Sequence, residues 1–257
     1  MVRKKQIDLI VVSTLIIAGA GITVLFSLTP LALGLLTLLI PSAYLIARKK
    51  KNPKKIVLAV VIFGAIFGFI FDFIVTLNEG WIVTRLMFPV RLFDFYPLVD
   101  DIIGFMLMTL MIVVFYEHFL DDEKNPRVSK NAVWSVIPSV LILIFILALY
   151  IINPALLSVP YVYLIGGAIA IVFPLYVALR KPKITDKLFK IAAFFFFVWL
   201  VLELAALKTE GWIFTGEYIG SVEIIGLVFP FEELFFWMMW YAASVVVYYE
   251  YYIDDKK

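Results

Sequence analysis

The chain has 257 residues, of which 64% are hydrophobic and only 16% are charged, with a mean hydropathy of +1.03. Soluble domains carry about 25% charged residues, so this composition excludes an ordinary soluble protein and predicts an integral membrane protein. The net charge of +2 is too small to indicate a nucleic-acid partner. The chain has no cysteine, its one histidine is His118, and it shows no nucleotide or zinc motif, so we expect neither a metal nor an organic cofactor.

The apolar stretches come first in chain order. A bilayer-spanning helix needs about 20 mostly apolar residues. The basic start at Arg3, Lys4 and Lys5 is typical of a signal peptide, but the apolar run continues without a cleavage site, so we expect a retained first helix. The sequence predicts an all-α membrane fold of eight spans at residues 7–28, 30–47, 56–77, 97–120, 132–152, 154–179, 188–207 and 224–253.

The basic residues predict the orientation of these spans. Nineteen of them precede the first span or follow the second, fourth, sixth and eighth, whereas Arg85, Arg91 and Lys208 fall on the other side. By the positive-inside rule, both termini are expected on the cytoplasmic face of the cell membrane. Glu117, Glu250 and His118 would then lie at the cytoplasmic ends of their spans, where we expect them to be solvated.

The sequence also repeats itself. Residues 79–84, EGWIVT, recur 131 positions later as residues 210–215, EGWIFT, with five of six letters identical. We therefore expect two tandem four-helix repeats in parallel orientation, residues 1–130 and 131–257, within one membrane domain. Asp72 matches Glu203 at the same spacing, and at a spacing of 133 Pro97 matches Pro230, Asp100 matches Glu233, and the pair Tyr116 and Glu117 matches Tyr249 and Glu250.

Six acidic residues lie near the outer ends of their spans. An acid at the centre of a membrane helix costs about 2.5–3.5 kcal/mol, and such residues almost always face a bundle interior. We expect these acids to converge on one cavity between the halves, where a crowded carboxylic acid can stay protonated and donate its proton. Helix-start stabilisation by the macrodipole and interhelical hydrogen bonding are the structural alternatives. The candidate catalytic acids are Glu232, Glu233, Asp100 and Asp101, and the supporting acids are Asp72 and Glu203.

Aromatic side chains surround these acids in the sequence. They are candidates for contact with a long apolar ligand, although an interfacial aromatic belt or simple packing would produce the same pattern. The candidate substrate-binding residues are Trp81, Trp212, Phe235, Phe236, Trp237 and Trp240.

The stretch PFEELFF, residues 230–236, resembles the lycopene cyclase domain family. Proline, one residue and two acids head a membrane helix, the stretch GWIFTGEYIGSVEIIG lies upstream, and FYEHF and YYEYY carry a Tyr-Glu pair late in their helices. The resemblance spans the whole chain and fits the fused, duplicated form of the family. The first half departs from the motif, because it reads PLVDD with Val99 where the second half has Glu232.

The resemblance implies a cofactor-free, non-redox enzyme that cyclises the acyclic ends of lycopene. One carboxylic acid would protonate the terminal double bond, and a base would remove a proton after ring closure, with Glu232 and Glu233 in these roles. The partners would be an apolar carotenoid or other polyisoprenoid substrate and membrane lipid. Homo-oligomerisation stays open. A divergent isoprenoid-binding protein, an ion-coupled transporter and a non-catalytic scaffold are the alternatives that the same repeat architecture allows.

Overall fold

The computed structural model describes residues 2–48, 52–90, 98–121 and 127–254. The predicted class is confirmed, since seven helices among these residues are long and apolar enough to cross a membrane and an eighth helical run closes the chain. Several residues used in the sequence analysis lie outside the described residues: Lys49, Lys50, Lys51, Arg91, Pro97, Lys124, Lys256 and Lys257.

The helices follow one another in short succession, and several spans consist of more than one labelled segment. The first four spans are α1 (Val2–Phe26), then α2 (Pro30–Gly34), η1 (Leu35–Leu39) and α3 (Ile40–Arg48), then α4 (Pro53–Ala59), η2 (Val60–Ile66) and α5 (Phe67–Leu77), then α6 (Val99–Tyr116) and η4 (Glu117–Asp121). The last four are η5 (Lys130–Ala132) with α7 (Val133–Ile152), α8 (Val162–Arg180), α9 (Pro182–Lys208), and η7 (Glu233–Tyr241), α10 (Ala242–Tyr248) and η8 (Tyr249–Ile253).

Local sequence explains where two of these spans begin. The side chain of Thr29 accepts from the backbone N–H of Ala32, and that of Asn52 accepts from the backbone N–H of Lys54. Each cap is followed by proline, which needs no N–H partner at the first helical position. The connections before these two spans can be short, because the capping side chains accept from the first backbone N–H groups of each helix.

Two expected spans begin later than predicted. The sixth was expected from residue 154, but Pro154–Leu157 forms only a 3₁₀ turn, η6, and α8 starts at Val162 after Pro160 and a left-handed Tyr161. The eighth was expected from residue 224, but the chain there forms a β-hairpin, so the helix starts only after Pro230. Ile225 and Gly226, both with positive φ, make the two-residue hairpin turn.

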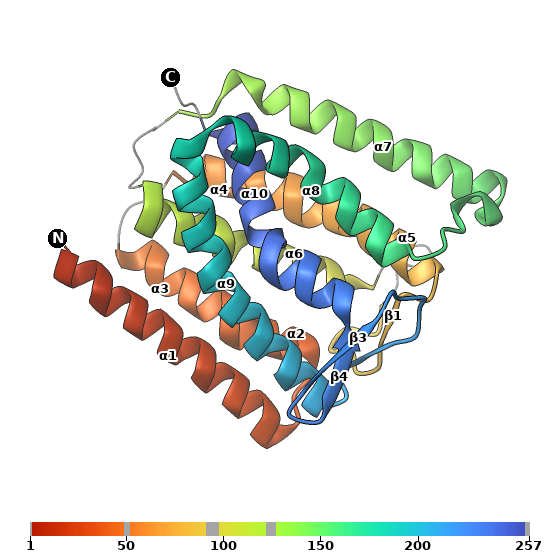
Figure 1. The fold of residues 1–257 in the computed structure, drawn as a ribbon, viewed down its shortest axis with the longest axis horizontal. Helices are drawn as coiled ribbons and strands as arrows, with labels where there is room; N and C mark the ends of the chain where they lie inside the picture. Colours follow the sequence, from red (N-terminus) through yellow and green to blue (C-terminus); the bar gives the residue numbers. More distant parts are fainter. Residues whose placement is uncertain (1, 49–51, 91–97, 122–126, 255–257) are drawn as a thin grey trace.

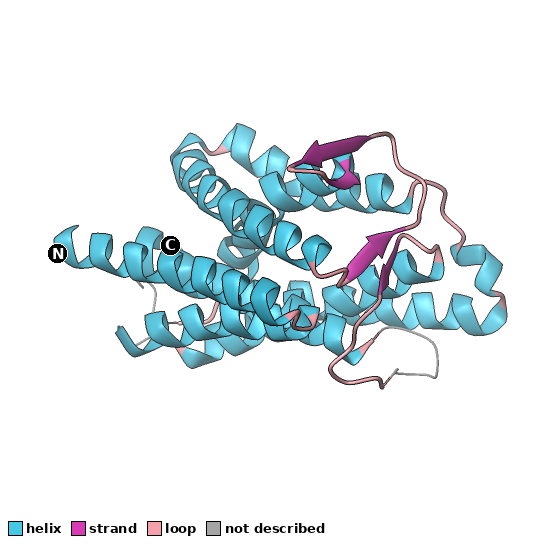
Figure 2. Cartoon of the chain, turned by 90° about the horizontal axis from the view of Figure 1, so that it is seen from below, coloured by secondary structure: helices cyan, strands magenta, loops and turns pink. Residues whose placement is uncertain are grey.

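Four short strands gather at one end of the bundle, which we call the strand end (Figure 2). Strand β1 (Trp81–Val83) pairs antiparallel with β2 (Trp212–Phe214), and β3 (Ser221–Ile224) pairs with β4 (Leu227–Pro230). Both chain termini lie at the opposite end, the terminal end, as Figure 1 shows. The β1–β2 pair therefore joins the loops that follow α5 and α9.

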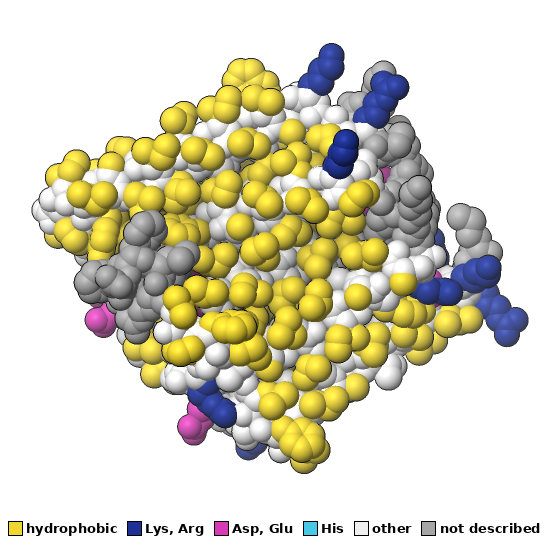
Figure 3. Space-filling model, turned by 180° about the vertical axis from the view of Figure 1, so that it is seen from behind, with side chains coloured by type: hydrophobic (Ala, Val, Ile, Leu, Met, Phe, Trp, Pro, Cys, Tyr) yellow, Lys and Arg dark blue, Asp and Glu magenta, His cyan; other side chains and the backbone are white. Residues whose placement is uncertain are grey.

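The surface of the bundle is largely apolar. Figure 3 shows a broad field of hydrophobic side chains with basic groups towards its margins. Large apolar residues such as Ile151, Ile169 and Leu179 are at least 70% exposed, which suits contact with lipid rather than water. The core runs through α6, α9 and α10, where Met111, Phe195 and Val246 are fully buried.

Candidate functional site: an acid cavity lined by aromatic rings

A cavity of about 160 Å³ lies at the strand end, and we call it the acid cavity. Four of the predicted acids reach it: Asp100 and Asp101 from the start of α6, Glu203 from α9 and Glu233 from the start of η7. Residues far apart in sequence thus converge on one space, as expected. The aromatic wall consists of Trp81, Phe105, Tyr163, Trp212, Phe214 and Trp237.

The β1–β2 pair places three of these rings. Trp81 lies opposite Phe214, and Trp212 lies opposite Val83, with Ile82 facing Ile213 between them. Alternate residues of a strand point to the same side. All four outer members of the pair line the cavity, whereas Ile82 and Ile213, between them, are 45% exposed.

Glu203 and Glu233 form one pair of acids within the cavity. Their carboxyls interact electrostatically. The hydroxyl of Tyr163 donates to Glu233 Oε2 at 2.5 Å, and the indole N–H of Trp212 donates to Glu203 Oε1 at 3.0 Å. Both carboxyls are therefore held by a neutral donor rather than by a cation.

Asp72 and Asp101 form a second pair. Their carboxyls interact electrostatically, as those of Glu203 and Glu233 do. The hydroxyl of Thr76 lies 3.4 Å from Asp72 Oδ1, and Trp81 also contacts Asp72. Asp72 is fully buried behind Asp101 and does not itself line the cavity.

The other two acids, Asp100 and Glu232, hold loops. Asp100 accepts from the backbone N–H of Met87 at 2.6 Å and from that of Phe88 at 2.9 Å. Glu232 Oε1 accepts from the backbone N–H of Ile219 at 2.8 Å, and Glu232 is not among the residues that line the cavity. Each carboxylate thus anchors the backbone 12 or 13 residues before it.

The charge of the cavity is one-sided. Among its described lining residues there are four acids and no lysine, arginine or histidine. A buried carboxylate without a cation is costly, and two carboxyls that share a low-dielectric site do not both ionise. Each pair therefore keeps at least one proton, so the cavity holds a carboxylic acid beside a carboxylate or a second acid.

The predicted aromatic residues divide by position. Trp81, Trp212 and Trp237 line the acid cavity, and Phe236 lines the pocket beside it. Phe235 stacks on Phe231 and packs edge-on against Phe236, so it is one ring removed from that pocket, and Trp240 is half-buried outside both.

Sequence reasoning missed Tyr163, which is 2% exposed and bonds to Glu233. The sequence gives little indication of this role. Tyr163 is a tyrosine near the start of a span, in the stretch YVYLIGG, and no similar stretch occurs in the first half. Phe105 was missed as well, because a phenylalanine inside a span reads as packing.

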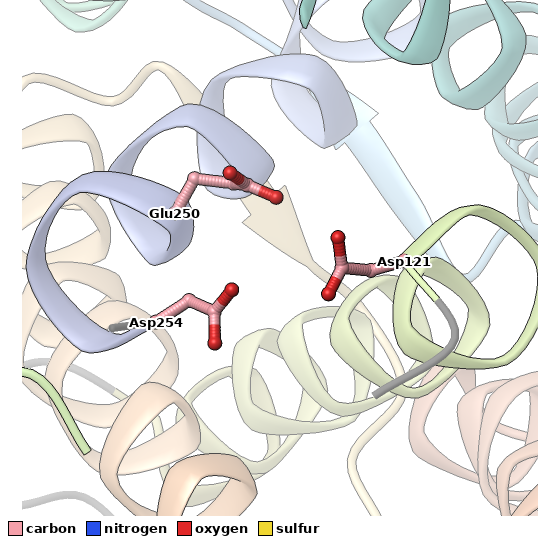
Figure 4. A group of neighbouring side chains, drawn as sticks. All are labelled: Asp121, Glu250 and Asp254. Atoms are coloured by element: carbon pink, nitrogen blue, oxygen red, sulfur yellow. The ribbon is translucent and has the colours of Figure 1, made fainter. Parts of the chain in front are cut away.

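A second group of acids lies at the terminal end. Asp121, Glu250 and Asp254 each place one carboxylate oxygen within 4.8 Å of the other two. Figure 4 shows the three side chains pointing toward a common centre, two of them from the last helical run. The expectation of solvated ends is wrong here, because Glu117, Glu250 and His118 are at most 8% exposed.

Two lysines compensate this second group, which we call the lysine cluster. Lys55 Nζ bonds to Asp254 and lies 3.7 Å from Glu117 Oε1. Lys187 Nζ lies 2.8 Å from Asp121 Oδ1 and 3.9 Å from Glu250 Oε1. Each ammonium group thus lies within 4 Å of two carboxylates, so the lysine cluster is an ion-pair network.

Two tyrosines complete the lysine cluster. The hydroxyl of Tyr116 donates to Glu250, and the hydroxyl of Tyr249 donates to Glu117. Both tyrosines are fully buried.

Comparison with family models, with curated proteins and with solved structures found no match to this chain. The likeness to lycopene cyclase domains therefore stays a prediction based on the short motifs quoted above.

Proposed function

We propose that this protein is a membrane enzyme that protonates a carbon–carbon double bond of a polyisoprenoid and so cyclises it, with the acyclic ends of lycopene as the candidate substrate. One observation carries the proposal: carboxyls paired with each other, without a cation among the described lining residues, face a cavity walled by indole and phenyl rings. A protonated acid and aromatic faces that stabilise a carbocation are what this chemistry requires.

The reaction balances without a redox partner. The carboxylic acid of Glu233 gives its proton to the less substituted carbon of the terminal double bond, which leaves a tertiary carbocation. The electrons of the next double bond close the six-membered ring and move the positive charge onto a ring carbon. A carboxylate, that of Glu233 or Glu203, then takes a proton from an adjacent carbon and restores a double bond. The product is an isomer of the substrate.

The size of the cavity fits an end group rather than a whole carotenoid. At about 160 Å³, the cavity is close to an engineered protein cavity of about 150 Å³ that binds benzene, so it holds about one six-membered ring. The aromatic rings that line the cavity, Trp212 and Trp237 among them, would then surround the cation and stabilise it.

We further propose the tandem parallel repeat as the framework of this site. Reciprocal contacts support it: Tyr116 donates to Glu250 while Tyr249 donates to Glu117. At the other end, Thr84 donates to the carbonyl oxygen of residue 210 and Thr215 to that of residue 79. The packing of the helices is also reciprocal, because the first span of each half packs on the third span of the other half. Helix α1 packs on α9, and α7 packs on η2 and α5.

The spacing between matched residues changes by one where a π-helix is present. Seventeen positions separate Lys55 from Asp72, against sixteen between Lys187 and Glu203, and η2 is the π segment in the longer stretch. A π turn, with its i→i+5 hydrogen bonds, accommodates an extra residue within a helix. Fifteen positions separate Asp101 from Tyr116, against sixteen between Glu233 and Tyr249, and η7 is the π segment there.

This spacing favours a different match of the acids from the one expected. Asp100 corresponds to Glu232, since both anchor a loop, and Asp101 corresponds to Glu233, since both belong to a buried pair that reaches the cavity. The first half then carries the same two adjacent acids as the second, with the proline shifted by one position.

The orientation in the membrane is also part of the proposal: both termini are cytoplasmic, and the acid cavity lies towards the outer face. Reporter fusions at residues 51 and 184 should read cytoplasmic, and fusions at residues 85 and 215 should read external.

Expression in a bacterium that accumulates lycopene tests the activity. We expect cyclic carotenoids in the extracted pigments of cells with the wild-type chain, and none with Glu233→Gln. The matched control is Glu223→Gln, an exposed acid in β3, which should leave the products unchanged. Unchanged lycopene in cells whose membranes contain folded wild-type protein would overturn this substrate.

Ion-coupled transport is the second candidate, because buried acids lie at both ends of the same bundle. Proton flux into vesicles that contain the purified protein, without any isoprenoid, would favour it over the cyclase.

A further inference from the structure

A second pocket of about 140 Å³ lies beside the acid cavity. Phe105 and Trp237 line both spaces, so their rings form the partition between the pocket and the acid cavity. Phe71 reinforces the partition, with its ring centroid 4.8 Å from that of Trp237 and 5.7 Å from that of Trp81. The second pocket continues between α5, α8 and η7, and we call it the groove.

The groove reaches the lipid-facing surface. Phe67, on α5, is 39% exposed, and Ala170, on α8, is exposed. Gly166 and Gly167 face it without side chains, which brings its floor close to the helix backbone. Residues 67–71 lie midway along the third span, so the groove opens at the depth of the hydrocarbon core rather than at either membrane surface.

Three residues that line the groove carry a polar group with no hydrogen-bond partner among the described residues: Ser244 Oγ, Trp237 Nε1 and the Tyr241 hydroxyl. Ser244 is 95% buried, being 5% exposed. An O–H or N–H group with no oxygen acceptor donates weakly to π electrons, so an unsaturated chain suits these donors better than a saturated one.

We infer that the groove binds the unsaturated apolar chain of a long polyisoprenoid, which slides in from the bilayer while its end enters the acid cavity past Phe105 and Trp237. The inference rests on the proposed function for the identity of that end group. The acid cavity holds only about one six-membered ring, so the rest of a long substrate must lie outside it. The groove is apolar and open to lipid, and the rings of Phe105 and Trp237, which line both spaces, separate it from the cavity.

Binding can be measured apart from catalysis. The purified chain in lipid nanodiscs is titrated with phytofluene, an acyclic isoprenoid polyene that accepts excitation energy from tryptophan, and the sensitised emission is recorded. Ala170→Phe fills the mouth of the groove, and Ile169→Phe, one residue away and 70% exposed to lipid, is the matched control. Ala170→Leu is the smaller second variant, and gel filtration shows which variants are folded.

We expect Ala170→Phe to weaken phytofluene binding by about tenfold or more, as the loss of about two buried methylene contacts would. Ala170→Leu should weaken it less, and Ile169→Phe and Glu233→Gln should bind like the wild type. Equal binding by folded Ala170→Phe, Ala170→Leu and wild type would overturn the groove, even if the chain makes rings. Saturable binding that Ala170→Phe weakens, in a chain that makes no rings, would support the groove and contradict the cyclase.

Discussion

The acid cavity and the lysine cluster are both buried groups of carboxyls, and they differ in what neutralises them. In the lysine cluster, Lys55 and Lys187 lie among four acids. The hydroxyls of Tyr116 and Tyr249 donate to acids of each other's span and so join the fourth span to the last. In the acid cavity, the described lining residues supply neutral donors only. Two ammonium groups let part of the lysine cluster ionise and so stabilise the fold, whereas buried acids without any cation must hold protons. Under the proposed function, the same residue type serves structure at one end and chemistry at the other.

Glu233→Gln should have the largest effect on turnover. The amide still accepts from the Tyr163 hydroxyl but has no proton to transfer, and general acids contribute about 10²- to 10⁴-fold. The rate of ring formation per folded molecule should fall by that factor, as measured by pigment analysis against protein quantified in the membrane. Normal turnover in this variant would contradict the assignment of catalysis to the acid cavity, and with it the functional difference between the acid cavity and the lysine cluster.

Lys55→Met should have the largest effect on stability. It leaves Asp254 and Glu117 buried without their ammonium partner, and breaking a buried ion pair costs about 3–5 kcal/mol. Thermal unfolding in detergent should show the loss, and the double variant Lys55→Met/Asp254→Asn should recover part of it.

The matched control for that experiment is Lys190→Met. Lys190 pairs with Asp186 on the exposed side of α9, and such pairs contribute about 0.3–0.5 kcal/mol. If both lysine variants unfolded at the same temperature as the wild type, the lysine cluster would not be a stabilising network.

Tyr163→Phe should have an intermediate effect on turnover. The change removes the hydroxyl that orients Glu233, and a hydrogen bond between neutral groups contributes about 0.5–1.5 kcal/mol, so kcat should fall about two- to tenfold. KM should change little, because the ring that faces the substrate remains. Tyr176→Phe, an exposed tyrosine on the same helix, should behave like the wild type. A change in KM alone would assign Tyr163 to substrate contact rather than to orientation of the acid.

Glu232→Gln should have the smallest effect. Its amide oxygen can still accept from the Ile219 N–H, so only the charge-assisted part of that bond is lost, about 1 kcal/mol or less. Glu232→Ala removes the acceptor, and the Ile219 amide should then exchange its hydrogen faster. If Glu232→Gln lost as much turnover as Glu233→Gln, both acids of the motif would have a catalytic role.

The sequence predicts the helices, and the convergence of the acids, because both follow from the cost of polar groups in a bilayer. It does not say which of two adjacent acids faces the cavity, since neighbours on a helix point about 100° apart and the π segment η7 shifts that direction. The hairpin before the last helix was missed because its residues, VEIIGLVFP, are as apolar as a span. Lys55 was read only as a charge that sets the orientation, and its bond to Asp254 of the other half could not be predicted, because it depends on how the two halves pack.

Ring formation in heavy water tests the central claim most directly. If Glu233 exchanges its proton with solvent and then gives it to the terminal double bond, each ring formed in D₂O should carry one deuterium, seen as a mass increase of one unit per ring. The wild-type chain should show this label, and Glu233→Gln should form neither ring nor label. Rings without deuterium from the wild type, or labelled rings at the normal rate from Glu233→Gln, would contradict the account.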